Sequence, residues 1–206
     1  MASDVKTILR AWTDRRQMRF ILITAIIYAA LLIPFKPFPI MLGFTEVRPA
    51  NFVPALFGVL LGPAAAWGSA IGNLLADIAS AAAMGGNGTL SLGSIFGFIG
   101  NFLYAYIAWK VWSLLIESEQ ESVDFHMLGV YCLAALAGSA LCALVIGMGI
   151  LAIDLQPFTE AMFMVMFITF NNFLPSAIIG SAALWLGYGT AKEYGWIYKA
   201  EKLRGK

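Results

Sequence analysis

Polar and charged side chains interrupt an otherwise very apolar sequence at a small number of positions. The stretch EVRPANFVPALFGVLLGP, residues 46–63, begins with an acid, a base and an amide and then becomes a sequence that a lipid bilayer would accept. Polar groups at membrane depth are costly, so each needs a partner or a function. Carboxylates, amides and phenols together suit the binding of a neutral or weakly cationic heterocycle. The candidate binding residues are Glu46, Arg48, Asn51, Asn73, Asp77, Asn101, Tyr104, Glu160, Asn171 and Asn172.

The composition places these residues in a membrane protein. Of the 206 residues, 60% are hydrophobic and only 12% are charged, whereas soluble domains carry about 25% charged residues. The net charge of +1 gives no reason to expect a nucleic acid as partner. The single histidine, His126, excludes a metal site built from several histidines. The two cysteines, Cys132 and Cys142, are expected to be small buried side chains, and we expect no metal or cofactor.

Six apolar segments position the polar residues. A membrane-spanning helix needs about 17–25 apolar residues. The second segment is short and is expected to be tilted or partly re-entrant, and the fifth and sixth are long and are expected to tilt or protrude. All six are continuous rather than alternating, which excludes a β-barrel. We therefore predict an all-α integral membrane protein with six transmembrane helices. The segments are residues 18–34, 47–62, 64–83, 91–116, 125–153 and 158–188.

The basic residues predict the orientation of these helices. If both termini are cytoplasmic, eleven of the thirteen basic residues lie on the cytoplasmic side, and only Lys36 and Arg48 lie outside. This gives a cytoplasmic N-terminal lead-in at 1–17, a membrane domain at 18–190 and a basic cytoplasmic tail at 191–206. The lead-in lacks the features of a secretory signal and is expected to form a short amphipathic helix on the membrane surface.

In this topology the polar residues gather in the outer half and the middle of the membrane. Asn73 and Asp77 lie one turn apart on the same helix face. The distribution indicates a pocket that opens to the outside and is closed towards the cytoplasm, and not a continuous pore. The alternative for each asparagine is that it only joins helices through hydrogen bonds.

Small residues recur at a spacing of four. Ala25 and Ala29 share one face of the first segment, and the pairs Gly68/Gly72 and Gly93/Gly97 repeat the spacing further along the chain. Such faces allow helices to approach closely. They serve either packing within the chain, the commoner case, or docking of another membrane subunit.

Taken together, these motifs resemble the S components of energy-coupling factor (ECF) transporters. Residues 47–77, VRPANFVPALFGVLLGPAAAWGSAIGNLLAD, resemble the Arg-x-x-Asn, Pro, Gly-Pro, Gly and Asn-Leu pattern of members grouped with queuosine-precursor carriers. Residues 93–107, GSIFGFIGNFLYAYI, resemble the fourth helix of the same group.

The resemblance implies a substrate-binding subunit in the cytoplasmic membrane of a prokaryote. Such a subunit captures a vitamin or similar micronutrient from outside. It then docks onto a membrane coupling subunit that works with two ATPases. By this resemblance Ala25 and Ala29 contact the coupling subunit, and the loop at 34–46 forms a lid over the pocket. The expected partners are therefore a small molecule, the ECF module and the lipid bilayer.

Two other classes of protein stay open. A small secondary carrier would work without an ATPase and would couple transport to an ion through Asp77. An intramembrane enzyme would use Asp77 with Asn73, or Glu160 with Asp154, as an acid/base pair. The sequence contains no nucleophile–base arrangement and no Walker motif, so we expect no enzymatic activity and an energy source in partner proteins.

Overall fold

The computed structural model describes residues 2–41, 45–46, 48–84, 90–116, 120–153 and 156–198. In these ranges the protein is a bundle of helices, as predicted, with one short antiparallel pairing of strands. The helices are α1 (Ala2–Arg10), α2 (Arg15–Leu32), η1 (Ile33–Phe35), η2 (Pro49–Asn51), α3 (Phe52–Leu61), α4 (Pro63–Met84), α5 (Gly93–Leu115), α6 (Phe125–Ala152), α7 (Phe158–Pro175), η4 (Ser176–Gly180) and α8 (Ser181–Glu193). The strands are β1 (Pro39–Met41) and β2 (Thr45–Glu46).

The strand pair is a short local feature of a fold that is otherwise helical, as predicted. It lies in the connection between α2 and α3, where the sequence contains Pro34, Pro37 and Pro39. Proline cannot continue a helix and favours extended backbone at the residue before it. The loop that the resemblance implies as a lid therefore contains this antiparallel strand pair.

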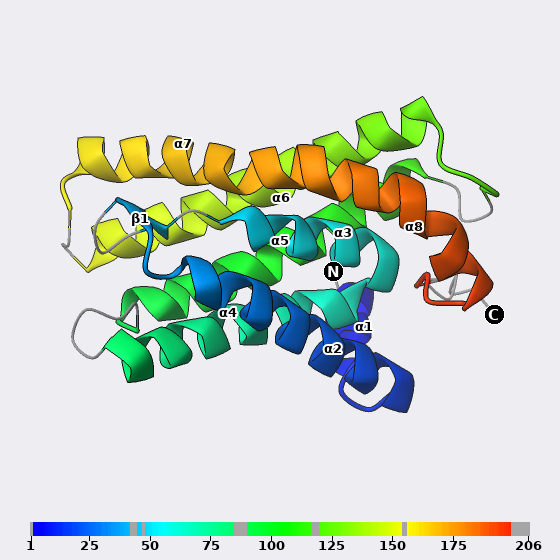
Figure 1. Ribbon diagram of the computed structural model, residues 1–206, viewed down its shortest axis with the longest axis horizontal. Helices are drawn as coiled ribbons and strands as arrows, with labels where there is room; N and C mark the ends of the chain where they lie inside the picture. Colours follow the sequence, from blue (N-terminus) through cyan, green and yellow to red (C-terminus); the bar gives the residue numbers. More distant parts are fainter. Residues whose placement is uncertain are drawn as a thin grey trace.

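The long helices run back and forth along one axis of the bundle (Figure 1). All six predicted apolar segments coincide with helices, and α7, η4 and α8 follow one another directly to form the last of them. Among the described residues, three helical stretches are long and apolar enough to cross a membrane, namely Arg15–Phe35, Phe125–Ala152 and Phe158–Glu193. Pro49–Leu61 is a shorter apolar helix. The number of spans and the side on which the termini lie stay predictions.

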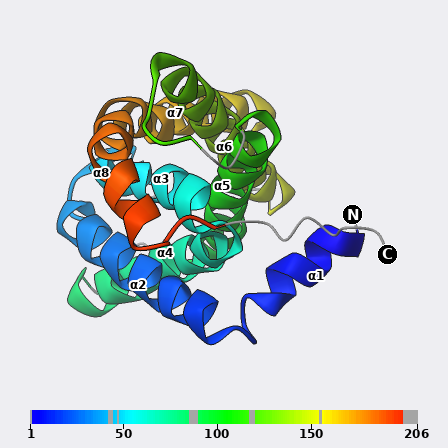
Figure 2. The same cartoon turned by 90° about the vertical axis from the view of Figure 1, so that its right-hand side faces the viewer.

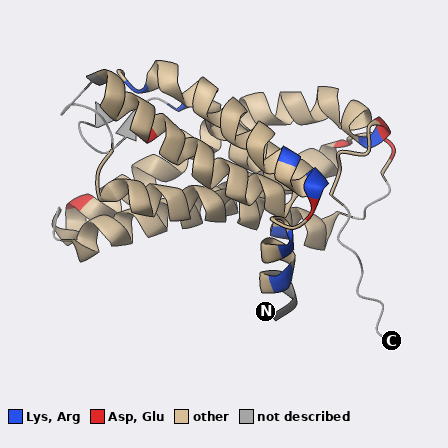
Figure 3. Ribbon diagram, turned by 90° about the horizontal axis from the view of Figure 1, so that it is seen from below, with Lys and Arg blue, Asp and Glu red and all other residues tan. Residues whose placement is uncertain are grey.

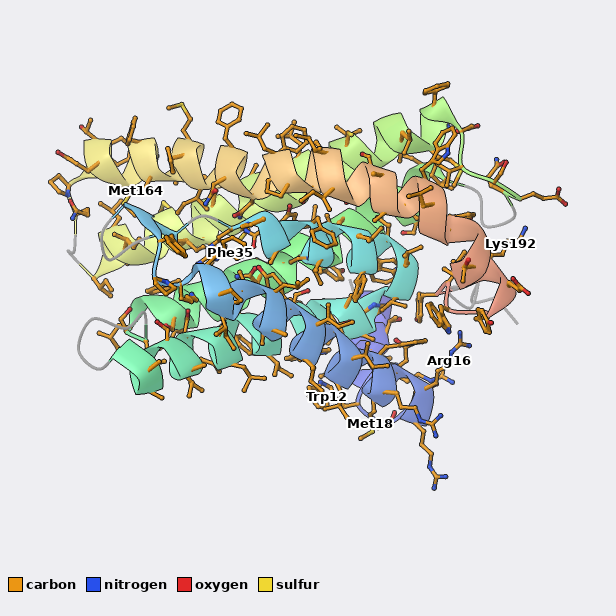
Figure 4. All side chains as sticks on the ribbon, in the orientation of Figure 1. Trp12, Arg16, Met18, Phe35, Met164 and Lys192 are labelled. Atoms are coloured by element: carbon orange, nitrogen blue, oxygen red, sulfur yellow. The ribbon has the colours of Figure 1, made fainter. Side chains whose placement is uncertain are left out.

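The two ends of the bundle differ. The start of α2 and the end of α8 lie together at one end, with α1 beside them, whereas β1, the end of α4 and the start of α7 lie at the other (Figures 1 and 2). Basic residues, drawn in blue, lie on α1, at the start of α2 and at the end of α8 (Figure 3). Figure 4 places the labelled Arg16 and Lys192 at this end and Met164 towards the opposite end. We call the two ends the basic end and the hairpin end.

Local sequence signals fix where helices begin. The Asp14 carboxylate caps α2 by accepting hydrogen bonds from the backbone N–H groups of Arg16 (2.7 Å) and Gln17 (3.0 Å). These two hydrogen bonds hold the pKa of Asp14 below its ordinary value, and the bond from Gln17 has the larger effect. Between α3 and α4, Gly62 adopts a left-handed backbone with φ of +62° and is followed by Pro63 at the first position of α4.

Small residues let α2 and α4 approach closely. A Cβ atom at Gly72 would lie 2.8 Å from the Ala25 carbonyl oxygen, and one at Gly68 would lie 2.5 Å from the Thr24 Cβ. These distances are too short for any side chain larger than that of glycine. The Gly68/Gly72 pair is thus used for packing within the chain.

Candidate functional site

Three buried asparagines from three different segments meet near the middle of the bundle. Asn51 ends η2, Asn101 lies on α5 and Asn172 lies on α7, and each has at most 1% of its surface exposed. Asn51 Nδ2 donates to Asn172 Oδ1. The Tyr28 hydroxyl of α2 lies 2.7 Å from Asn51 Oδ1 and 2.8 Å from Asn101 Oδ1. The three amides and this phenol therefore form one connected polar centre.

A break in the last long helix adds two hydroxyl groups to this centre. Pro175 ends α7, and the backbone N–H of Ser176 bonds to the Phe173 carbonyl instead of continuing the α-helical ladder to Asn172. The Asn172 carbonyl oxygen accepts instead from the hydroxyls of Tyr104 (3.0 Å) and Ser176 (3.1 Å). The two hydroxyl oxygens lie 2.6 Å apart. The helix break thus makes a main-chain acceptor part of the polar centre.

A charged cluster lies beside the polar centre, since Gly97, whose carbonyl oxygen accepts from Asn101 Nδ2, is packed against Asn73 Nδ2 of this cluster. We call the polar centre and the charged cluster together the network. Lys36, which directly follows η1, forms an ion pair with Asp77 of α4, with 2.6 Å between Nζ and Oδ1. The two side chains are only 2% and 6% exposed. Asn73 Nδ2 donates to Asp77 Oδ2 over 3.4 Å, and Arg48 Nη1 donates to Asn73 Oδ1 over 3.4 Å. The connection after α2 is therefore tied to α4 by a buried ion pair.

Seven of the ten sequence-predicted binding residues belong to this network. They are Arg48, Asn51, Asn73, Asp77, Asn101, Tyr104 and Asn172. Of the other three, Glu160 is exposed in the first turn of α7, and Asn171 is partly buried beside Asn172. The backbone of Glu46 lies in β2, and its side chain is outside the part of the chain that the structure describes.

Three members of the network were not predicted from the sequence. Tyr28, Lys36 and Ser176 are 0%, 4% and 0% exposed. Tyr28 lies within the Ala25–Ala29 motif. A hydroxyl group beside a packing face needs a buried partner, so the sequence could have indicated its place in the network. Lys36 was identified only as a base outside the membrane, because its partner on α4 is distant in the sequence. Ser176 could have been predicted from Pro175, which precedes it. A proline inside a helix leaves a backbone carbonyl without its helical hydrogen bond, and a nearby hydroxyl can supply one.

The predicted docking residues lie inside the bundle. Ala25 and Ala29 are 2% and 6% exposed, and the Ala25 backbone contacts α4 at Gly72. The outward side of α2 is formed instead by residues such as Leu22 and Ile26, which are 60% and 63% exposed. In this conformation the small-residue face of α2 is used for packing within the chain.

The chemistry available to the network is recognition by hydrogen bonds. Its amides, phenols and charged groups offer both donors and acceptors, and they come from segments that are far apart in the sequence. In the described ranges no group of three histidine, cysteine or acidic side chains is placed to hold a metal ion. Asp77, which would be the acid or base of an intramembrane enzyme, is engaged in the ion pair with Lys36. The second pair considered for an enzyme includes Asp154, which lies outside the described residues.

An open recess of about 350 Å³ lies beside α4 and α5 at the hairpin end. Its lining is apolar apart from two serines, and it consists of Leu74, Leu90, Ser91, Ser94, Ile95 and Phe98. Specific recognition of a polar solute needs several converging polar groups, which this recess does not supply. The buried network is therefore the better candidate site.

Apolar helices long enough to cross a bilayer, packed around a buried polar network, are typical of membrane transport proteins. The model of the QueT transporter family matches residues 19–187, so the chain belongs to this family, the queuosine-precursor S components of ECF transporters. The resemblance predicted from the sequence is thus confirmed. Comparisons with curated proteins and with solved structures gave no match.

Proposed function

We propose that the chain is the substrate-binding subunit of an ECF-type importer. It captures a queuosine precursor, or a similar vitamin-like micronutrient, from outside the cell. The observation that carries this proposal is the buried network around Asn51, Asn101 and Asn172 in a member of a transporter family. Amide groups that present both donors and acceptors match the polar edge of a heterocyclic base.

The proposed energy source is a set of partner proteins. The sequence contains no Walker motif, so ATP hydrolysis belongs to two cytoplasmic ATPases that act through a membrane coupling subunit. The proposed topology is six spans with both termini in the cytoplasm of a prokaryotic cell. The clustering of basic residues on α1, α2 and α8 supports this orientation.

Substrate entry requires the network to exchange bonds. The network side chains bond to one another, so a ligand must replace some of those bonds with its own. We propose that the asparagines and Tyr104 contact the substrate and that Arg48, Asn73 and Asp77 form the outer wall of the site. Glu46, Glu160 and Asn171 lie at its edge in this proposal. The Lys36–Asp77 ion pair holds the lid segment against α4.

Docking through Ala25 and Ala29 would require α2 to move relative to α4. Both alanines are buried, and Ala25 lies against α4 at Gly72, so a coupling subunit reaches this face only when the two helices separate. Docking is then linked to a rearrangement of the same helix that carries Tyr28. This link provides a route by which partner binding disturbs the substrate site.

Calorimetric titration of the purified protein with a queuosine precursor base tests the proposed function. We expect one site per chain, and we expect Asn101→Ala to weaken binding by about tenfold or more, since a lost buried hydrogen bond costs about 1–3 kcal/mol. Gln120→Ala is the matched control, because Gln120 is an exposed amide in the α5–α6 connection. Equal affinities for the wild-type protein and Asn101→Ala would argue against a binding site in the network.

A secondary carrier is the alternative that the buried carboxylate of Asp77 favours. In that case uptake by cells would continue after removal of the ATPases and would lose its ion dependence in Asp77→Asn. In the importer that we propose, uptake stops when the ATPases are removed.

A further inference from the structure

Helix α1 leaves the bundle sideways at the basic end. Viewed along the bundle, α1 extends outward from the ring of helices, and viewed from below it runs across the long axis (Figures 2 and 3). Its connection to the bundle is well packed. Trp67 Nε1 of α4 donates to the Ile8 carbonyl oxygen over 3.1 Å, and Ala11 is buried in a cluster with Ile21 and Ala64. The direction of α1 is therefore fixed by contacts with the bundle.

One side of α1 and of the turn after it presents apolar residues that the described chain leaves exposed. Val5, Leu9 and Trp12 are 55%, 57% and 43% exposed. Their spacing of four and then three residues places them along one side of the helix. A short helix with such an apolar side needs a surface to cover it.

Basic residues flank this apolar side. Lys6 and Arg10 are exposed on α1, and Arg15, Arg16 and Arg19 are exposed at the start of α2. The sequence of α1 also contains one acid, Asp4, and Asp14, which follows α1, is engaged as the cap of α2. The combination of an apolar side with flanking positive charge complements the anionic surface of a phospholipid leaflet.

Aromatic side chains form a row of ring contacts that begins beside α1 and continues along α5. Ring contacts run from Trp12 to Trp67, with centroids 5.5 Å apart, and then to Phe102 at 4.8 Å. The ladder continues through Tyr106, Trp109 and Tyr198. Tryptophan and tyrosine concentrate at the boundary between hydrocarbon and headgroups. Trp12 and Trp67, where this row begins, therefore favour a position of α1 at that boundary when the bundle spans a bilayer.

We propose that α1 is an interfacial anchor that binds anionic phospholipid headgroups at the basic end. Val5, Leu9 and Trp12 insert into the boundary region, while Lys6 and Arg10 bind the phosphate groups. The proposal does not depend on the substrate or on the ECF partners. It needs only that the bundle spans the membrane.

Fluorescence of Trp12 in the full-length protein tests this proposal. The protein is reconstituted into nanodiscs of phosphatidylcholine, with or without phosphatidylglycerol, that contain lipids brominated on the acyl chain. Subtracting the spectrum of Trp12→Phe isolates the Trp12 signal from the other five tryptophans. We expect bromolipid quenching of Trp12 that increases with phosphatidylglycerol and loses this increase at high salt.

Matched variants separate the two parts of the proposal. Lys6→Gln/Arg10→Gln should lose most of the increase caused by phosphatidylglycerol, and Lys192→Gln, an exposed base on α8, should retain it. Val5→Ser/Leu9→Ser should lose quenching in both lipids. Absent quenching in the wild-type protein, or quenching that ignores both phosphatidylglycerol and salt, would overturn the proposal. Protection of Trp12 only after addition of a coupling subunit would overturn it too, and would identify a protein as the occupant.

Discussion

Lys36 Nζ lies 2.6 Å from Asp77 Oδ1, and both side chains are almost completely buried. Lys36 follows the end of α2 and Asp77 lies on α4, so the ion pair joins the connection that leads into the hairpin to the wall of the polar network. A buried charge that loses its partner is strongly destabilising. The ion pair therefore couples the position of the connection to the integrity of the site.

Removing one partner of this pair should cost more stability than removing both. We expect Lys36→Met or Asp77→Leu alone to destabilise the protein by about 3–5 kcal/mol, because the remaining charge stays buried without its partner. The double variant should recover much of this loss. Thermal unfolding of the four proteins in detergent measures the coupling, and purely additive effects would contradict the role assigned to the pair.

Arg48 should contribute to substrate affinity from the outer wall of the site. Arg48→Ala removes the group that donates to Asn73 Oδ1 and should weaken substrate binding by roughly tenfold. Arg48→Lys keeps the charge but not the planar donor group, so it should restore affinity only in part. An unchanged dissociation constant in Arg48→Ala would exclude Arg48 from substrate binding.

The packing of α2 on α4 should distinguish Ala29 from its neighbour Ala30. Ala29 is 6% exposed, whereas Ala30 is exposed. Ala29→Leu should lower stability by about 1–3 kcal/mol through overpacking, and Ala30→Leu should leave it nearly unchanged. Unfolding in detergent checks this difference. Co-purification with the coupling subunit then tests docking: Ala30→Leu should interfere only if the exposed side of α2 is the docking surface.

The orientation of the bundle can be tested by cysteine labelling in whole cells. Thr13→Cys and Glu193→Cys are exposed positions at the basic end, and Leu92→Cys is an exposed position near the hairpin end. An impermeant maleimide should label Leu92→Cys in intact cells and the other two only after the membrane is opened. The unsubstituted protein controls for Cys132 and Cys142, which are partly and fully buried. The reverse labelling pattern would contradict cytoplasmic termini.

Helix positions and the polar cluster were predictable from sequence because both follow from the cost of polar groups in lipid. Continuous apolar runs give the helices, and Asn51, Asn101 and Asn172 stand out against them. It was harder to predict which side chains pair with one another, because Lys36 and Asp77 are 41 positions apart in the sequence and meet only in the folded chain. The alanine motif was ambiguous for the same reason: small residues pack equally well against α4 and against another subunit.

The central claim is that the protein holds a small heterocyclic substrate in its buried polar network. Mass spectrometry of small molecules released by denaturing the purified protein tests this claim most directly, after the protein has been incubated with queuosine precursors and washed. The account predicts one molecule of a precursor, or of a similar vitamin-like compound, per chain, and a large loss of this molecule in Asn101→Ala. Release of no such compound from the folded wild-type protein would contradict it.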